Sequence, residues 1–189
     1  RRICSCPDKL PQAILQQIKT SHTESSIPQG IKNKLENTFE QSSITTNTPE
    51  PKVSIIMPAY NAADYIQEAI ESVLCQNYRN FELIIINDGS TDNTKNIIES
   101  FKNNRIKYFY QKNKGLAGAH NAGIKKAQGL FLTKLDSDDL ITPDFITRHI
   151  QEFEKHPEAD LVYCDDYLID ENSKPIRVIK RPEYTDRKT

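Results

Sequence analysis

The chain has 189 residues and nearly balanced charge, with 25 Lys and Arg against 26 Asp and Glu. This balance excludes bulk electrostatic attraction to nucleic acid or to an anionic membrane surface. No apolar run approaches the roughly 18 residues that a membrane span needs, so we expect no transmembrane segment in this chain. Four scattered cysteines and the lack of an Asn-x-Ser/Thr site favour a cytoplasmic location. A position at the inner face of the membrane, held there by the parent protein or its partners, is compatible with this expectation.

The first part of the chain differs in composition from the rest. Residues 1–51 are rich in Ser, Thr, Asn, Gln and Pro, and residues 42–51 contain almost no apolar side chain. We interpret residues 1–51 as an N-terminal extension and linker, and residues 52–189 as the folded domain. Because the sequence begins with Arg1 and stops in a charged stretch, both ends are expected to be cuts from a longer protein.

Beyond residue 52 the apolar pattern alternates between strand and helix periods, as in βαβ construction. Helical spacing predicts helices at residues 63–74, 91–101 and 116–127, and a fourth that runs to about residue 155 after Thr142 as N-cap and Pro143. A hairpin is expected over residues 167–179. The predicted fold class is α/β, with a mostly parallel, Rossmann-like sheet flanked by helices. Its strands are expected at residues 53–57, 81–86, 105–110, 130–135 and 160–164.

Polar residues gather where three of the predicted strands end. In open α/β sheets, ligands bind beyond the carboxyl ends of the strands, where loops converge and helix N-termini present free N–H groups. We therefore expect the three groups to share one rim of the sheet. They are Pro58-Ala59-Tyr60-Asn61, Asn87-Asp88-Gly89-Ser90 and Asp136-Ser137-Asp138-Asp139.

The third group places three carboxylates within four residues. Such like charges repel, and a counter-cation stabilises them; carboxylate oxygens at D-x-D spacing suit Mg²⁺ or Mn²⁺ shared with a diphosphate. The alternative is that Asp138 or Asp139 caps the following helix. We predict a metal site at Asp138 and Asp136.

The first two groups suit a nucleotide. Asp88 lies at a strand terminus, where its carboxylate can accept the imide N–H of uracil. Tyr60 can stack on a base, and Pro58 shapes the exit from the strand. Asn61 either bonds the nucleotide or caps the next helix, and both roles remain open.

Four motifs in order make the chain resemble a known family. They are V-S-I-I-M-P-A-Y-N at 53–61, I-I-N-D-G-S-T-D at 85–92, N-K-G-L-A-G-A-H-N-A-G at 113–123 and L-D-S-D-D at 135–139. The chain resembles the family 2 inverting glycosyltransferases of GT-A fold, and especially bacterial chondroitin and hyaluronan polymerase-type transferase domains. The resemblance implies polysaccharide biosynthesis, with a UDP-sugar donor, a Mn²⁺ or Mg²⁺ ion at a DXD motif, and a glycan or lipid-linked acceptor activated by a carboxylate base.

The resemblance also implies roles for individual residues. Asp138 would bind the metal directly, with Asp136 at the ribose or just outside the direct ligands. Other nucleotide-binding positions are Ala59, Tyr60 and Asp88 around the uracil, Asn113, Lys114 and Gly115 in a loop near the nucleotide, and Ser137 beside the acidic pair.

Two departures from the family pattern bear on function. His120 stands where the family commonly has Arg, so a permanent cation is replaced by a mostly neutral group. Only fifty residues follow Asp139, so the general base is expected beyond Thr189 and the domain is expected to be truncated before its acceptor-binding part. Asp165 and Asp166 are weaker candidates for the base, with a role in the hairpin or at the acceptor edge as the alternative.

Two other functions compete with this interpretation. A catalytically incomplete nucleotide-sugar-binding or interaction module would need no base. A nucleotidyltransferase would need a Gly-rich, basic loop after the first strand, and residues 58–61 supply neither.

Overall fold

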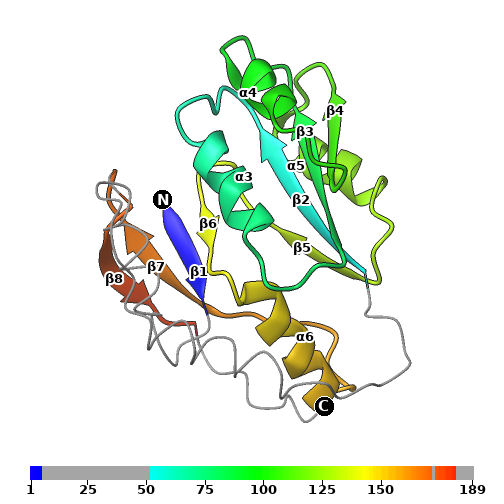
Figure 1. The fold of residues 1–189 in the computed structure, drawn as a ribbon, viewed down its shortest axis with the longest axis vertical. Coiled ribbons are helices and arrows are strands. Elements are labelled where there is room, and N and C mark those ends of the chain that lie inside the picture. The colour runs from blue at the N-terminus through cyan, green and yellow to red at the C-terminus, as the bar shows by residue number, and fades with distance from the viewer. Residues whose placement is uncertain (6–51, 172, 182–189) are drawn as a thin grey trace, which may run out of the picture. The chain divides into compact units, whose positions relative to one another are not determined.

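The computed structural model describes residues 1–5, 52–171 and 173–181, which form two four-stranded sheets with helices (Figure 1). The larger sheet is parallel throughout, in the order β4-β3-β2-β5. Its strands are β2 (Val53–Ala59), β3 (Phe81–Asn87), β4 (Ile106–Tyr110) and β5 (Phe131–Lys134). The helices are α3 (Ile66–Leu74), α4 (Thr94–Ser100), α5 (Gly115–Ile124) and α6 (Phe145–Lys155).

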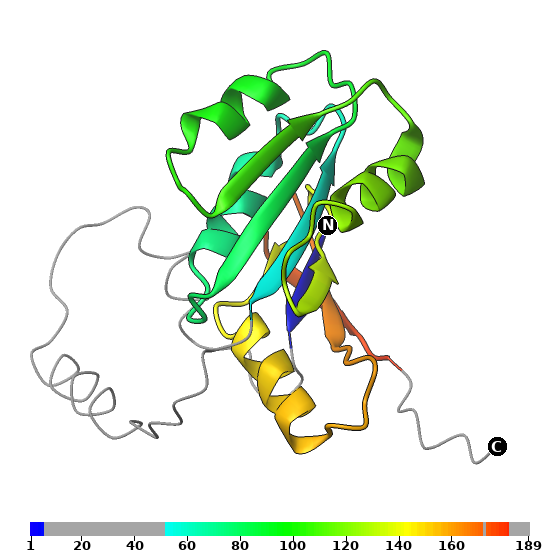
Figure 2. The same ribbon diagram turned by 90° about the vertical axis from the view of Figure 1, so that its right-hand side faces the viewer.

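The two central strands are buried on both faces, which explains their continuous apolar runs. One face, with Ile55 and Leu83, belongs to a core that also contains Ile70 of α3 and Ile146 of α6. On the other face, Ile84 packs in a smaller cluster with Ala119 of α5. Helices therefore cover both faces, as Figure 2 shows for α3 and α5 on either side of the strands. The predicted α/β class with a parallel sheet is confirmed.

The smaller sheet has the order β6-β1-β7-β8. It consists of β6 (Leu140–Ile141), β1 (Arg2–Ser5), β7 (Asp165–Ile169) and β8 (Pro175–Ile179). Strands β7 and β8 form an antiparallel hairpin, as predicted for residues 167–179. Strand β1 lies between β6 and β7, parallel to the first and antiparallel to the second (Figure 1).

The position of β1 differs from the interpretation of residues 1–51 as an extension. Strand β1 has four residues, among them the buried Ile3, and so short a segment shows no hydrophobic period in the sequence. Its partner strands also lie far along the chain. The remaining features expected between residues 6 and 51 lie outside the described residues. Among the described helices, none has the length and apolar character to cross a bilayer.

Two local predictions are wrong. No strand forms at residues 160–164; the strand begins at Asp165, where pairing with β1 and β8 becomes available. Thr142 does not cap α6, because Asp144 is the N-cap and its carboxylate accepts a 2.8 Å hydrogen bond from the Thr142 hydroxyl. The short strand β6, which was not expected, occupies residues just before that helix.

A buried carboxylate joins β2, β3 and the turn before β5. Glu82 is 3% exposed, and its Oε1 accepts hydrogen bonds from the Ser54 hydroxyl at 2.7 Å and the Gln128 N–H at 2.8 Å. Its Oε2 accepts from the Lys52 ammonium at 2.8 Å. Burial raises the pKa of Glu82, but the hydrogen bonds from Lys52, Ser54 and Gln128 outweigh burial and leave this pKa below its ordinary value.

Replacing Glu82 with Gln tests this network. Glu82→Gln should lower the free energy of unfolding at pH 7 by about 2 kcal/mol, because Lys52 and the buried donors lose their anionic partner. Since the folded-state pKa is lowered, the stabilisation is present above the unfolded pKa of about 4.3 and is lost as pH falls through the folded value. Urea unfolding from pH 7 to pH 3 should therefore show a steeper loss of stability for wild type than for Glu82→Gln. An equal loss of stability with falling pH in wild type and Glu82→Gln would contradict this role.

Candidate functional site

The site begins where β2 and β5 separate. Their pairing ends at Ile56 and Lys134, followed by a last 2.9 Å hydrogen bond from the Leu135 N–H to the Ile56 carbonyl. Backbone N–H and C=O groups of successive residues point to opposite sides of a strand. Pro58 therefore faces β5, as Ile56 does, but it has no N–H to donate. The ladder to β3 continues to Ala59, whereas the chain after β5 diverges. A gap opens between the end of β2 and residues 135–138.

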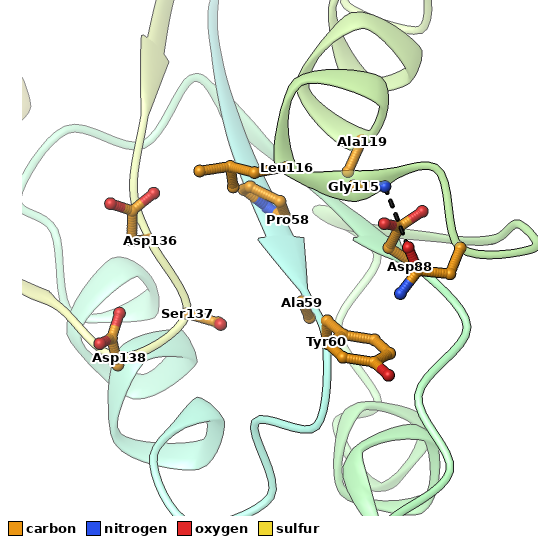
Figure 3. A pocket seen from close by; sticks show the side chains of 11 residues that line it. Pro58, Ala59, Tyr60, Asp88, Gly115, Leu116, Ala119, Asp136, Ser137 and Asp138 are labelled. Atoms are coloured by element: carbon orange, nitrogen blue, oxygen red, sulfur yellow. Dashed lines mark hydrogen bonds between the residues drawn. The ribbon is translucent and has the colours of Figure 1, made fainter.

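A cavity of about 360 Å³ lies at this gap (Figure 3). Asp136 and Asp138 lie on one side of the end of β2, and Asp88 and Gly115 lie on the other. Most of the nucleotide-site and metal-site residues predicted from the sequence therefore come together at one place. The lining comprises Pro58, Ala59, Tyr60, Asp88, Asn113, Gly115, Leu116, Ala119, Asp136, Ser137 and Asp138.

Asp88 connects the cavity to the loop before α5. The residue is 3% exposed, and its Oδ1 accepts hydrogen bonds from the Gln111 side-chain amide at 2.6 Å and the Lys114 backbone N–H at 2.9 Å. None of the described residues donates to its Oδ2. Asp88 therefore orders the loop with Oδ1, while Oδ2 has no donor among the described residues. Lys114 contributes its backbone to this contact and does not line the cavity.

Asn61 also lies outside the cavity lining and connects two loops. Its backbone has φ +49°, its Oδ1 accepts a 2.9 Å hydrogen bond from the Thr91 N–H, and its own N–H donates to the Ser90 hydroxyl at 3.0 Å. Helix α3 begins at Ile66 with Tyr65 as N-cap, so Asn61 does not cap it. The loops after β2 and β3 are thereby held together.

The N-terminus of α5 forms another wall of the cavity. Gly115 has φ +74°, a left-handed conformation that suits glycine, and its N–H donates to Asn113 Oδ1 at 3.0 Å. Leu116 and Ala119 lie on this wall and were not predicted as site residues. Ala119 lies four positions after Gly115 and three after Leu116, which are the spacings of one helix face, and this is the sequence signal that could have identified the wall.

The acidic loop presents its three carboxylates in different ways. Asp136 Oδ1 is buried and has no hydrogen-bond partner among the described residues. Asp138 is exposed and lines the cavity. Asp139 turns toward β1, where its Oδ1 accepts a 2.6 Å hydrogen bond from the Arg2 N–H. Burial raises the pKa of Asp139 and the charges of Asp138 and Asp136 raise it further, against the Arg2 hydrogen bond, and the net effect is a raised pKa.

These carboxylates fit a divalent ion that is shared with a ligand. The buried, unpartnered oxygen of Asp136 is a costly arrangement that a cation or a hydroxyl donor would relieve. Within the described residues, no three His, Cys, Asp or Glu side chains are grouped to hold a metal on their own. Mg²⁺ is commonly bound through one or two carboxylates with phosphates and water completing the shell, so Asp138 and Asp136 suit this mode. The alternative that Asp138 or Asp139 caps α6 is wrong, because Asp144 is the N-cap.

Three residues considered from the sequence lie away from the cavity. His120 lines a separate cleft beside β5. Asp165 accepts a 2.8 Å hydrogen bond from the Arg181 N–H, and the buried Asp166 pairs with the Arg181 guanidinium. Both aspartates thus stabilise the β7–β8 hairpin, which was the alternative to a role as general base.

Comparisons with known proteins agree with this geometry. A family model described as glycosyl transferase family 2 matches residues 54–188. An uncharacterized glycosyltransferase of Rickettsia typhi is 44% identical over 135 residues, which cover 71% of this chain and 42% of that protein. The chondroitin synthase of Escherichia coli is 38% identical over 122 residues, 64% of this chain and 18% of the synthase. The chain therefore spans less than half the length of these relatives.

A solved structure gives the same result. S. aureus TarS (residues 1–349) in complex with UDP-GlcNAc is similar to this chain with a TM-score of 0.54 and 32% sequence identity, over 56% of this chain and 32% of that one. The sequence match covers most of the chain and includes every element that lines the cavity. The chain belongs to glycosyl transferase family 2 and has the GT-A type of fold.

Proposed function

We propose that this domain binds a UDP-sugar with a Mn²⁺ or Mg²⁺ ion in the cavity at the end of β2, and that the protein transfers the sugar with inversion to a glycan or lipid-linked acceptor. One observation carries the proposal. The cavity has an exposed tyrosine and a buried carboxylate on one side, and an acidic loop with an unpartnered oxygen on the other. A nucleoside diphosphate has the matching order of groups.

The first side suits the nucleoside. Tyr60 is 55% exposed although it lines the cavity, so its ring is available to stack on a base. Asp88 Oδ2 can accept the imide N–H of uracil, while its other oxygen holds Lys114 and Gln111. Pro58 and Ala59 provide an apolar floor with no competing donor.

The other side suits the diphosphate. Asp138 and Asp136 would hold the ion, and Ser137 can donate a hydrogen bond beside them. When bound, the ion supplies positive charge that stabilises the UDP leaving group. The N-terminus of α5 at Gly115 adds a favourable field for negative charge on the facing wall.

The comparisons support the donor class and the kind of product. TarS was crystallised with UDP-GlcNAc, and the relative from Escherichia coli is a chondroitin synthase. We assign no proton transfer to Asp165 or Asp166, because Arg181 holds both.

A panel of nucleotide sugars tests the function directly. UDP-sugars with Mn²⁺ should raise the melting temperature by several degrees, whereas GDP-sugars and UDP-sugars with EDTA should have little effect. A ligand that binds only the folded state stabilises it by an amount that increases with the logarithm of its concentration over its Kd. UDP release in the presence of oligosaccharide acceptors should then identify the transferred sugar. Strong binding of a UDP-sugar without any release of UDP would favour the donor-binding module instead, and no binding of any nucleotide sugar would overturn the proposal.

The metal assignment is tested at Asp138. Asp138→Ala should abolish Mn²⁺-dependent binding of UDP, because it removes the exposed carboxylate of the acidic pair, while uridine binding without metal persists. Asp64→Ala is the matched control, since this exposed carboxylate follows β2 but does not line the cavity. Calorimetry with UDP and MnCl₂ measures both variants. Unchanged affinity in Asp138→Ala would rule out this assignment.

The nucleobase assignment is tested at Tyr60. Tyr60→Ala should weaken uridine and UDP binding by a similar factor of about 10 to 100, which corresponds to a base–aromatic stacking energy of roughly 1–3 kcal/mol. Tyr60→Phe keeps the ring and should bind nearly as wild type. If Tyr60→Ala weakened UDP binding but left uridine binding intact, the base would have to lie elsewhere.

A further inference from the structure

Arg1, the residue just before β1, contacts the loop that carries the acidic pair. Its side chain is 9% exposed, and its Nε donates a 2.8 Å hydrogen bond to the backbone carbonyl of Asp138. Asp138 is one of the two aspartates of the acidic pair that line the cavity. The backbone of the proposed metal ligand is thus held by a guanidinium that lies 137 residues earlier in the sequence.

The same guanidinium is held by two other elements. It forms an ion pair with Glu68 of α3, and its Nη1 donates a 3.2 Å hydrogen bond to the Ser173 hydroxyl in the β7–β8 turn. Ser173 in turn donates to Glu68 Oε1 at 2.7 Å, and the Tyr65 ring lies 4.8 Å from the guanidinium carbon. Arg1 therefore has a fixed orientation, because its planar fork meets partners on three sides.

A second contact from β1 holds the next residue of the loop. The Arg2 N–H donates a 2.6 Å hydrogen bond to Asp139 Oδ1. The Asp139 N–H donates a 3.0 Å hydrogen bond to the Asp136 carbonyl and so closes a turn. Strand β1 is also paired with Leu140 and Ile141 directly beyond the loop. The loop is thus held at its backbone and at its far end.

We propose that Arg1 and Glu68 are positioning residues for the donor site, which orient the Asp136–Asp138 pair toward the metal and diphosphate. This inference rests on the proposed function for the identity of the ligand, but its structural part, order in the acidic loop, does not. Neither residue lines the cavity. Their effect passes through the carbonyl of Asp138.

Positioning can be separated from the effect of net charge. If only charge mattered, Arg1→Gln would tighten cation binding, because a positive charge leaves, and Glu68→Gln would weaken it. If positioning matters, both variants weaken it, because each breaks the same cluster. Residues that support metal ligands from outside typically change metal affinity by about 10- to 100-fold when replaced.

The experiment compares Arg1→Gln and Glu68→Gln with two matched controls. Arg2→Gln removes the same charge from an exposed neighbouring side chain. Glu71→Gln removes a carboxylate on α3 whose hydrogen-bond partner among the described residues is Gln67. Calorimetry measures Mn²⁺-dependent binding of UDP, ligand-observed NMR measures uridine without metal, and amide hydrogen exchange follows residues 136–141 in the ligand-free protein.

Both test variants should weaken Mn²⁺-dependent UDP binding by about 10-fold or more, keep uridine binding, and speed exchange at residues 136–141, with neither control doing so. Arg1→Lys, which keeps the charge but not the planar fork, should fall between wild type and Arg1→Gln. Opposite effects of the two test variants, or unchanged exchange at residues 136–141, would overturn the inference. Because exchange is measured without ligand, it decides the structural part of the inference, order in the acidic loop, even if wild type fails to bind UDP. That failure would count against the proposed function.

Discussion

The arrangement of the cavity depends on one missing hydrogen-bond donor. Pro58 lies in a central, buried strand and cannot extend the ladder toward β5, so the chains after β2 and β5 diverge. On the other side, where the N–H groups are present, β2 stays paired with β3 to its end. The parallel sheet therefore opens between β2 and β5, and the polar loops lie around that opening.

The opening separates two kinds of chemistry. Asp88 is buried and already bonded, so it acts as a fixed acceptor and also orders the loop before α5. The aspartates beyond β5 are crowded, and one oxygen of Asp136 lacks a partner. The cavity thus has a fixed hydrogen-bond acceptor at one end and a concentration of negative charge at the other. Burying Asp136 without a partner has a cost that a bound ligand can offset.

The sequence predicts the sheet and much of the candidate site because both depend on local patterns. Buried strands in a parallel sheet read as apolar runs, and polar groups at their ends must share one rim. The role of Asn61 was not resolved, since its partners Ser90 and Thr91 come from another loop and their approach depends on tertiary structure. Strand β1 was missed for a related reason: its pairing with β6 and β7 is entirely long-range, and four residues carry no period.

The two ends of the cavity are supported in different ways, because Asn61 links the loop after β2 to the loop after β3. The Asn61 and Ala62 N–H groups donate to the Ser90 and Thr94 hydroxyls, and the Thr91 N–H donates to Asn61 Oδ1. These bonds join the two loops at one end of the cavity. The acidic loop has no such link to β2 and is anchored from the far side by β1. A change in β1 should therefore disturb residues 136–139 and leave the joined loops at the other end of the cavity in place.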